Sequence, residues 1–380
     1  MPGTDPLPRP RKLGGYDFYR DVLGSPKLVV APMVDQSELA WRKMSRRYGA
    51  QLVYTPMINA KMFANNQGKG NKSFRENVFN LAFGEEGGVE DRPLIIQFCA
   101  NDPEQLLTSA LALQHRCDGV DINLGCPQDI AKKGRYGCWL QEEWELIYEM
   151  INTLHTKLSV PVTAKFRVFP TVERTVEYAK MLERAGAQIL TCHGRTRDQR
   201  GHSSGLADWD KIRAVKQAVS VPVFANGNVL FYSDIARCLE YTGCDAVMSA
   251  EGNLYNPAIF LPSSPSPCSP HPVPAGSAST TILPSLAQAL SGTYKLHYEL
   301  ALEYLDIVAA QKTRTPFSAV KGHLFKLLRP ALGREKDLRE KMGRIRREQL
   351  DEYREVVLEV RERMETESEF LVEGYERSRR

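Results

Sequence analysis

The sequence predicts an α/β fold, a (β/α)8 TIM barrel followed by a small C-terminal helical domain. Eight short runs rich in Val, Ile, Leu and Phe recur between residues 27 and 260, and helical patterns separate them. The runs lack polar–apolar alternation, as expected of parallel strands buried on both faces. A doubly wound sheet would show the same succession, but no GxGxxG motif follows the first run, and regular spacing favours the barrel. The predicted strands are 27–32, 51–55, 93–98, 119–123, 161–166, 188–192, 222–226 and 245–249.

Between these runs lie amphipathic helical patterns with ordinary stop signals. The stretch 38–49 ends at Gly49, and the stretch 171–187 carries its apolar residues at helical spacing before Gly186. Glycine directly after the last periodic residue is a common helix stop because it adopts the left-handed conformation without strain. The barrel is therefore predicted to occupy residues 27–260.

The segments outside the barrel have different compositions. Residues 1–26 are rich in Pro and Gly at their start and are predicted to form a loose arm. Residues 261–292 are rich in Pro, Ser and Ala and bury too little apolar surface to offset the entropy of ordering, so disorder is predicted. Residues 293–380 are predicted to be a helical domain with a charged tail, built from stretches at 294–311, 317–333 and 334–365.

Composition excludes several classes of protein. The chain has 380 residues, 42% of them hydrophobic and 25% charged, as in ordinary globular domains. No apolar run reaches the roughly 18 residues that a membrane span needs, and no secretory or mitochondrial address is visible. The expected location is the cytoplasm, with the nucleus as an addition. Eight scattered cysteines without a CxxC pair indicate reduced thiols and no metal site.

Polar or glycine-containing segments follow the predicted strands, where the active site of a TIM barrel lies. A flavin cofactor needs particular partners, and these residues can supply them. Lys165 suits the N1–C2=O edge of a flavin, which becomes negative on reduction, and the Gln97 amide can pair with the C4=O and N3–H edge. The turns Asn226-Gly227-Asn228 and Ala250-Glu251-Gly252 follow the last two strands, the usual phosphate location in this fold. Pro32 and Met33 can lie along the flavin ring.

The segment after the fourth strand carries two cysteines. It reads DINLGCP at 121–127 and continues to KKGRYGC at 132–138. Cys126 precedes a proline near a strand end and is interpreted as structural. Cys138 lies in a glycine-flanked loop that can present a side chain to a ligand, although a small buried apolar role is the alternative. The neighbouring Lys132, Lys133 and Arg135 make the loop suited to a phosphodiester chain.

These motifs, together with APM at 31–33, KFR at 165–167, HGRT at 193–196, NGN at 226–228 and NPAIF at 256–260, resemble the tRNA-dihydrouridine synthases. The resemblance is greatest to the eukaryotic subgroup that modifies uridines sixteen and seventeen of the D-loop. It covers residues 27 to 260 and, more loosely, residues 294 to 333.

The resemblance implies an FMN-dependent reaction with NADPH or NADH as reductant and tRNA as partner. Reduced flavin would give hydride to C6 of a flipped uracil, and Cys138 would protonate C5, its pKa lowered by electropositive neighbours. The implied cofactor-binding residues are Pro32, Met33, Val34, Gln97, Lys165, His193, Asn226, Gly227, Asn228, Ala250, Glu251 and Gly252. The implied substrate-binding residues are Asn123, Arg167, Arg195, Lys132, Lys133, Arg135, Lys321 and Lys326.

Basic residues of the helical region are expected to contact the RNA. The enzyme is expected to act as a monomer. Besides Lys321 and Lys326, this predicted clamp includes Lys312, Arg314, His323 and Arg329. The alternative for such a run is a solvated charged face. Many family members have Gly-Arg where this chain has Ala250-Glu251, so a flavin phosphate must here be bound by backbone N–H groups or by Arg195.

Two other functions remain open from the sequence. An FMN-dependent barrel that reduces a free small molecule would explain Lys165, Gln97 and the glycine turns, but not the basic helices. A non-catalytic RNA-binding protein on an enzyme scaffold would explain the basic helices, but not the flavin-type residues or Cys138.

Overall fold

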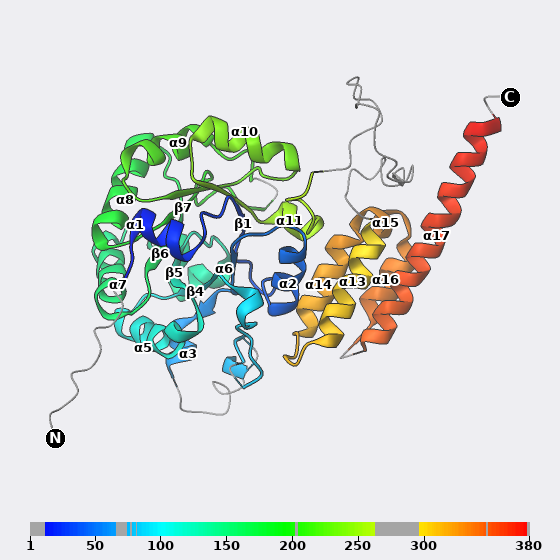
Figure 1. Ribbon diagram of the computed structural model, residues 1–380, viewed down its shortest axis with the longest axis horizontal. Coiled ribbons are helices and arrows are strands. Elements are labelled where there is room, and N and C mark those ends of the chain that lie inside the picture. The colour runs from blue at the N-terminus through cyan, green and yellow to red at the C-terminus, as the bar shows by residue number, and fades with distance from the viewer. Residues whose placement is uncertain are drawn as a thin grey trace, which may run out of the picture.

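The computed structural model describes residues 12–65, 74–76, 78–80, 82–201, 204–262, 296–346 and 349–377, with side chains up to residue 366. Within these residues a barrel lies beside a separate group of helices (Figure 1). No described helix has the length and apolarity that crossing a membrane requires.

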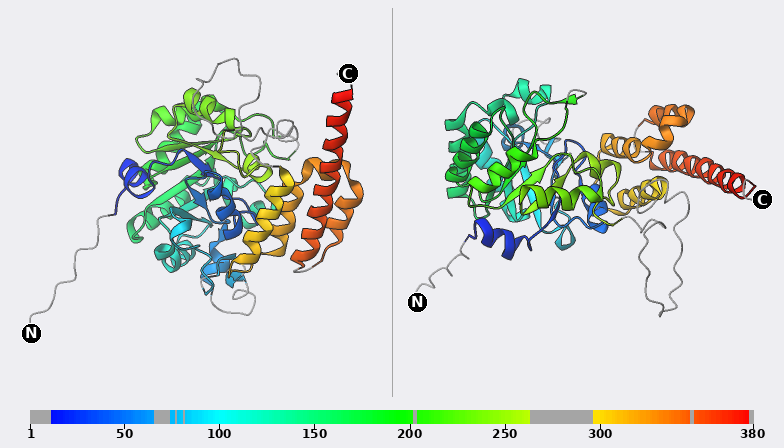
Figure 2. Two further views of the ribbon diagram at one scale, coloured as in Figure 1. Left: turned by 45° about the vertical axis from the view of Figure 1, so that its right-hand side comes forward. Right: turned by 90° about the horizontal axis from the view of Figure 1, so that it is seen from above.

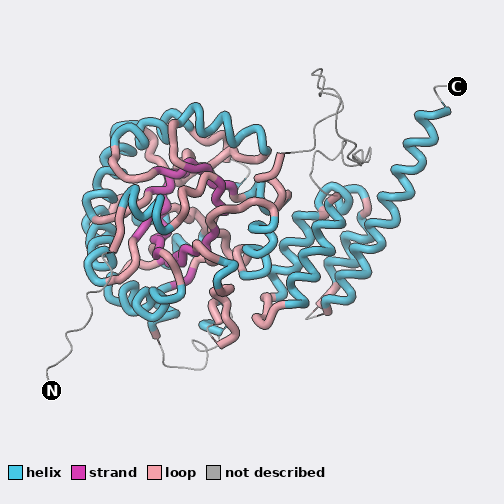
Figure 3. Tube along the Cα trace, viewed as in Figure 1, coloured by secondary structure: helices cyan, strands magenta, loops and turns pink. Residues whose placement is uncertain are grey.

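The barrel is closed by parallel strands in the order β1-β9-β8-β7-β6-β5-β4-β2. A bridge between Val29 and Leu52 joins β1 to β2, and the short β3 (Ile58–Asn59) adds to β4. The strand ring encloses the centre of the fold (Figure 3). All eight predicted strands are present, and the predicted barrel is confirmed. They are β1 (Leu28–Val30), β2 (Val53–Tyr54), β4 (Leu94–Cys99), β5 (Gly119–Leu124), β6 (Val162–Arg167), β7 (Leu190–His193), β8 (Val223–Asn226) and β9 (Ala246–Ser249).

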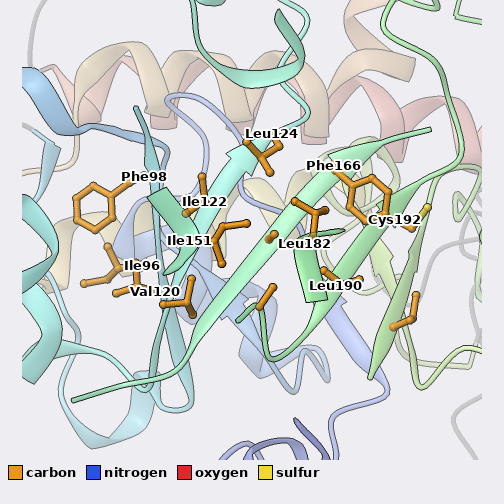
Figure 4. Packing of buried hydrophobic residues seen from close by; sticks show 14 of the residues in the cluster. Ile96, Phe98, Val120, Ile122, Leu124, Ile151, Phe166, Leu182, Leu190 and Cys192 are labelled. Carbon is orange, nitrogen blue, oxygen red and sulfur yellow. The ribbon is translucent and has the colours of Figure 1, made fainter. Parts of the chain in front are cut away.

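Helices cover the outer face of the barrel and bury the apolar side of each strand. Ile122 of β5 and Phe166 of β6 lie in one buried cluster with Ile151 and Leu182 from the helices outside (Figure 4). Each such side chain contributes roughly 1.5–3 kcal/mol when fully buried. The covering helices are α2 (Leu39–Arg47), α3 (Ala60–Ala64), α5 (Pro103–Leu113), α7 (Trp144–Lys157), α8 (Val172–Ala185), α9 (Trp209–Ala218) and α10 (Tyr232–Thr242).

The N-terminal segment packs against the barrel. Residues 15–22 form two helical turns, α1 (Gly15–Asp17) and η1 (Phe18–Val22). Phe18 is 0% exposed and joins a cluster with inward-facing strand residues such as Ile95 and Phe224. The Tyr19 hydroxyl donates to the Asp245 carbonyl at 3.0 Å. The predicted loose arm over 1–26 is therefore wrong for this part, because its aromatic residues bury their apolar surface under the barrel.

The C-terminal helices form a second apolar core. Two predicted boundaries are wrong. The stretch 317–333 divides at Leu328, and Pro330 lies in the first turn of the next helix, where its missing N–H costs nothing. The stretch 334–365 divides near Ile345. The helices are α13 (His297–Ala310), α14 (Phe317–Leu327), α15 (Arg329–Arg334), α16 (Lys336–Arg344) and α17 (Leu350–Arg377). Beyond residue 262, the predicted disordered segment 261–292 lies outside the described residues.

A buried polar cluster joins the barrel to these helices. Trp41 of α2 stacks on His323 of α14 with ring centroids 4.0 Å apart. Two acceptor oxygens of Glu38 face the helices: Oε1 accepts from the Tyr304 hydroxyl at 2.7 Å, and Oε2 lies 3.1 Å from His323 Nε2. On the barrel side, Trp41 Nε1 donates to Asn253 Oδ1 at 2.9 Å. The helices therefore extend from one side of the barrel, as two further views show (Figure 2).

Candidate functional site

The strand register places polar side chains together inside one end of the barrel. Asn123 pairs with Lys165 across β5 and β6, Arg167 pairs with His193 across β6 and β7, and His193 pairs with Asn226 across β7 and β8. Successive residues of a strand point to opposite faces, so the apolar residues between them face the outer helices. The structure thus brings Gln97, Asn123, Lys165, His193 and Asn226 together.

Lys165 is a half-buried cation with capacity for further hydrogen bonds. Burial and, second, the charge of Arg167 lower its pKa to about 8, while the charge of Asp121 opposes both. Its Nζ donates to Asn226 Oδ1 at 2.9 Å. An ammonium group that is desolvated in this way is suited to an anionic partner. This environment fits the negative charge that a flavin gains on reduction.

The amides of Gln97 and Asn123 are engaged with protein groups. Asn123 Nδ2 donates to Gln97 Oε1 at 2.8 Å, and Gln97 Nε2 donates to Asp121 Oδ2 at 2.7 Å. Asn123 Oδ1 accepts from the backbone N–H groups of Gly125 and Cys126 at 3.0 and 2.9 Å. Contacts with a flavin or a uracil are left to the second N–H and the remaining lone pair of these amides.

His193 and Arg195 connect the barrel mouth to the turn at residues 226–228. Burial, followed by the charges of Lys165, Arg167 and Arg195, holds the pKa of His193 well below its ordinary value. The neutral ring therefore accepts a hydrogen bond at Nε2 from Arg195 Nη1, 3.2 Å away. Arg195 Nη2 donates to Asn228 Oδ1 at 2.7 Å. Arg195 thus lies beside the Asn226-Gly227-Asn228 turn, one of the two turns predicted to bind a flavin phosphate.

The two glycine-containing turns have no space for larger residues. Gly227 has φ of +113°, and a Cβ there would lie 2.6 Å from the Ala207 side chain. A Cβ on Gly252, next to Ala250 and the exposed Glu251, would lie 2.6 Å from the Val229 carbonyl oxygen. Both turns therefore present backbone, which fits phosphate binding through N–H groups.

The segment after β1 is less enclosed. Pro32 and Met33 are half-buried, and Met33 packs against both the barrel core and the core of the C-terminal helices. Its N–H donates to the Ser37 hydroxyl at 2.8 Å, whereas Val34 is 41% exposed. Pro32 and Met33 remain candidates for contact with a flavin, and Val34 lies toward solvent.

The structure contradicts the accessibility expected of Cys138. This residue lies in η4 (Gly137–Leu140) and is 0% exposed. Its Sγ lies 3.2 Å from the Cys126 carbonyl oxygen, to which its N–H also donates. Burial raises the pKa of its thiol to about 12, against the lowering influence of Arg167 and Arg197. The predicted low pKa is wrong because desolvation exceeds the effect of the charges.

Cys126 is the half-buried thiol of this pair. It follows the turn that Asn123 Oδ1 stabilises, and it interacts electrostatically with both Lys165 and Arg167. Burial raises the pKa of its thiol, so Cys126 carries its proton at neutral pH. Cys126 was interpreted as structural because it precedes Pro127. A position before proline does not predict whether the cysteine side chain is accessible.

The predicted basic loop is organised by an aromatic residue that the sequence analysis missed. Lys132 Nζ lies 4.9 Å from the centre of the Trp139 ring, and the guanidinium carbons of Arg197 and Arg200 lie 5.3 and 6.0 Å from it. Lys133 is exposed, and Arg135 lies 3.6 Å from Glu143 in an exposed ion pair. Arg197 and Arg200 were also missed, although the arginine-rich sequence RTRDQR at 195–200, after β7, indicates a basic segment at this end of the barrel.

A cleft of about 1050 Å³ opens above this region, between the barrel and α15. Four arginines line it, opposed by the carboxylates of Asp129 and Glu251: these are Arg167, Arg195, Arg200 and Arg329. Arg329 Nη1 donates to the Tyr255 hydroxyl at 2.8 Å and lies over its ring. The cleft therefore joins barrel loops to the helical region in one largely cationic surface.

The other predicted basic residues of the helices divide into three groups. Lys321 Nζ donates to the carbonyls of Gly343 and Ile345, at the end of α16, and His323 is fully buried at the interface with α2. The RNA contact predicted for these two is therefore replaced by structural contacts. Lys326 is half-buried near Glu251. Lys312 and Arg314 are exposed.

Comparisons with known proteins agree with this geometry. A family model described as dihydrouridine synthase (Dus) matches residues 29–317. A tRNA-dihydrouridine(16/17) synthase-like protein of Rattus norvegicus is 48% identical over 335 residues, which cover 88% of this chain and 67% of the rat protein. The corresponding protein of Mus musculus is also 48% identical, and the match covers 88% of this chain and 62% of the mouse protein. The NAD(P)-dependent tRNA-dihydrouridine(16/17) synthase of Schizosaccharomyces pombe is 47% identical over 88% of this chain and 76% of the yeast protein.

Proposed function

Because this chain belongs to the dihydrouridine synthase (Dus) family, we propose that it is a flavoenzyme that reduces uridines of tRNA to 5,6-dihydrouridine. Members of the family use FMN and NAD(P)H. The names of the relatives specify positions 16 and 17, which are therefore the proposed target uridines. The chain is proposed to act as a monomer in the cytoplasm or nucleus.

The observation that carries the proposal is the cationic cleft directly outside the polar end of the barrel. Arg167 and Arg195 belong both to the cleft and to the surroundings of Lys165 and His193. The cleft of about 1050 Å³ lies at the upper end of the roughly 300–1,000 Å³ typical of small-molecule sites, so its charge and not its size favours an RNA substrate. Its arginines suit the phosphodiester chain on either side of a flipped nucleotide.

The residues at the mouth fit FMN. Lys165 would lie at the flavin edge that gains negative charge, and Gln97 would hold the opposite edge with its free N–H. The turns containing Gly227 and Gly252, with Arg195 beside the first, would hold the phosphate. When bound there and reduced by NADPH or NADH, FMN would supply the hydride for C6 of uracil.

Cys126 is the proposed proton donor to C5, in place of Cys138. Its raised pKa keeps the proton on sulfur at neutral pH, the form that a general acid requires. Asn123, through its free N–H, would orient the uracil edge. Arg167 stabilises the loop after β7 by donating to the Thr196 and Gln199 carbonyls at 2.8 and 2.9 Å, and its charge favours the thiolate left after proton transfer.

The test is a two-part assay on the purified chain. We expect a flavin absorption spectrum and, after incubation with NADPH and unmodified tRNA, new dihydrouridine at positions 16 and 17 by mass spectrometry. Flavin without tRNA product, together with turnover of free uracil or an enone, would replace this proposal with a small-molecule reductase. tRNA binding without flavin would indicate a non-catalytic RNA-binding protein.

A further inference from the structure

Asp121 is a buried carboxylate to which the proposed mechanism assigns no role. It is 0% exposed and lies in β5, two residues before Asn123, which pairs with Lys165. Its cross-strand neighbours are Gln97 on β4 and Thr163 on β6. Gln97 Nε2 donates to Oδ2 at 2.7 Å, and the Thr163 hydroxyl donates to Oδ1 at 2.6 Å. Each carboxylate oxygen is therefore engaged by a different strand.

The hydrogen bonds above Asp121 have one common direction. The N–H groups of Gly125 and Cys126 donate to Asn123 Oδ1, Asn123 Nδ2 donates to Gln97 Oε1, and Gln97 Nε2 donates to Asp121. A side-chain amide can turn over and exchange its donor and acceptor, but an ionised carboxylate only accepts. Asp121 at one end of this chain only accepts, and the backbone N–H groups of Gly125 and Cys126 at the other end only donate, so both ends favour the same orientation of the two amides.

We propose that Asp121 is a positioning residue that acts through Gln97 and Asn123 to set the turn that carries Cys126. The inference deepens the proposed function, on which only its activity readout depends. Without an acceptor at position 121, the Gln97 N–H group loses its buried partner, and the chain loses the anchor that disfavours the turned amide. A turned Gln97 amide would place an N–H against Asn123 Nδ2, and turning Asn123 in response would leave the Gly125 and Cys126 N–H groups without their oxygen.

The experiment measures the rate at which iodoacetamide alkylates Cys126 in the folded protein, followed by peptide mass spectrometry. Asp121→Leu keeps the branched shape and has no acceptor, and Asp121→Asn keeps an oxygen for the Gln97 N–H. Thr163→Val is the matched control, because it removes the other hydrogen bond to the same carboxylate and leaves the amide chain intact. Circular dichroism establishes that each variant is folded.

We expect Asp121→Leu to change the alkylation rate of Cys126 by about tenfold, the factor that corresponds to one lost buried hydrogen bond. Asp121→Asn and Thr163→Val should stay within about threefold of the unaltered protein. Dihydrouridine formation should fall in parallel with the change in Cys126 reactivity. If Asp121→Leu does not fold, Gln97→Met interrupts the same chain at its middle link and should give the same tenfold change.

Unchanged Cys126 reactivity in the folded Asp121→Leu or Gln97→Met variant would overturn the inference. An equal effect of Thr163→Val would also overturn it, because it would show that the carboxylate acts on the barrel in general. Alkylation requires neither tRNA nor NADPH, so the result stands if the proposed function fails.

Discussion

Lys165 and Cys126 show how burial sets the chemistry of single residues at the barrel mouth. Removal from water disfavours the charged form of each, so it lowers the pKa of the lysine and raises that of the thiol. The same effect acts more strongly on Cys138, whose thiol is fully enclosed. Accessibility therefore distinguishes two cysteines that lie twelve positions apart in the segment between β5 and α7.

Cys126 and Cys138 should respond differently to substitution by alanine. Cys126→Ala should lower dihydrouridine formation by at least about 10²-fold, the contribution of a general acid, while FMN stays bound. Cys138→Ala should keep activity within about threefold, because only a weak hydrogen bond to the Cys126 carbonyl is lost. Single-turnover assays with unmodified tRNA measure both. Loss of activity in the Cys138 variant alone would restore the acid role to that residue.

The second residue-scale prediction concerns the pH dependence of FMN binding. Lys165 is cationic below its pKa of about 8 and neutral above it. If the cation holds the flavin, the Kd for FMN should rise above pH 8, approaching tenfold for each further pH unit. Flavin fluorescence titrations from pH 6 to 9.5 measure it.

Two variants check the assignment of this pH dependence. Lys165→Met should bind FMN more weakly at pH 7 and show no inflection near pH 8. Lys180→Met, on the exposed face of α8, should behave like the unaltered protein. An inflection that persists in Lys165→Met would assign the titration to another group.

At the scale of elements, similar side chains have different roles according to the helix that receives them. Lys321 lies on α14 and Arg329 lies on α15, and both belong to the predicted RNA clamp. Lys321 donates to carbonyl groups at the C-terminal end of α16, where a cation stabilises the helix dipole. Arg329 is exposed, contacts Tyr255 and lines the cleft. Only the second is available to a phosphate.

The element-scale prediction separates these two contacts. Arg329→Ala should weaken tRNA binding and reduce the slope of log affinity against log salt by about 0.7–0.9, the value for one phosphate contact. Lys321→Ala should leave that slope unchanged and lower the free energy of unfolding by about 0.5–1 kcal/mol. Filter binding over a salt series and urea denaturation measure the two quantities. A reduced slope in the Lys321 variant would return this residue to the RNA-binding surface.

At the scale of the whole molecule, the cleft exists because the barrel and the C-terminal helices are held together. Glu38 precedes α2 and accepts hydrogen bonds from Tyr304 on α13 and His323 on α14. Trp41 contacts His323 on one side and Asn253 of α11 (Glu251–Tyr255) on the other. The position of Arg329 relative to Arg195 therefore depends on this interface.

The whole-molecule prediction is that Glu38→Gln loosens the interface. Glutamine supplies one acceptor where two are used, so one buried donor loses its partner, at a cost of about 1–3 kcal/mol in unfolding free energy. tRNA affinity should fall while FMN content is unchanged. Glu359→Gln, in the exposed pair with Lys341, is the control and should cost at most about 1 kcal/mol. Equal effects of the two variants on tRNA affinity would count against a role of this interface in shaping the cleft.

The sequence alone determined the barrel and the residues at its mouth. Parallel strands buried on both faces require continuous apolar runs, and their ends converge on one site, so strands and strand-end residues such as Lys165 and Asn226 could be located from the chain. The motif DINLGCP with the other short motifs was sufficient to indicate the family.

Only the tertiary structure decided which of these groups are accessible and what the helices do. Cys126 and Cys138 differ in exposure because η4 folds beneath the Cys126 carbonyl. His323 lies 285 positions from Glu38 in the chain, and the N-terminal aromatic residues are buried under strands that come much later. Burial and hydrogen-bond partners arise from contacts between distant segments, and such contacts leave no local signal in the sequence.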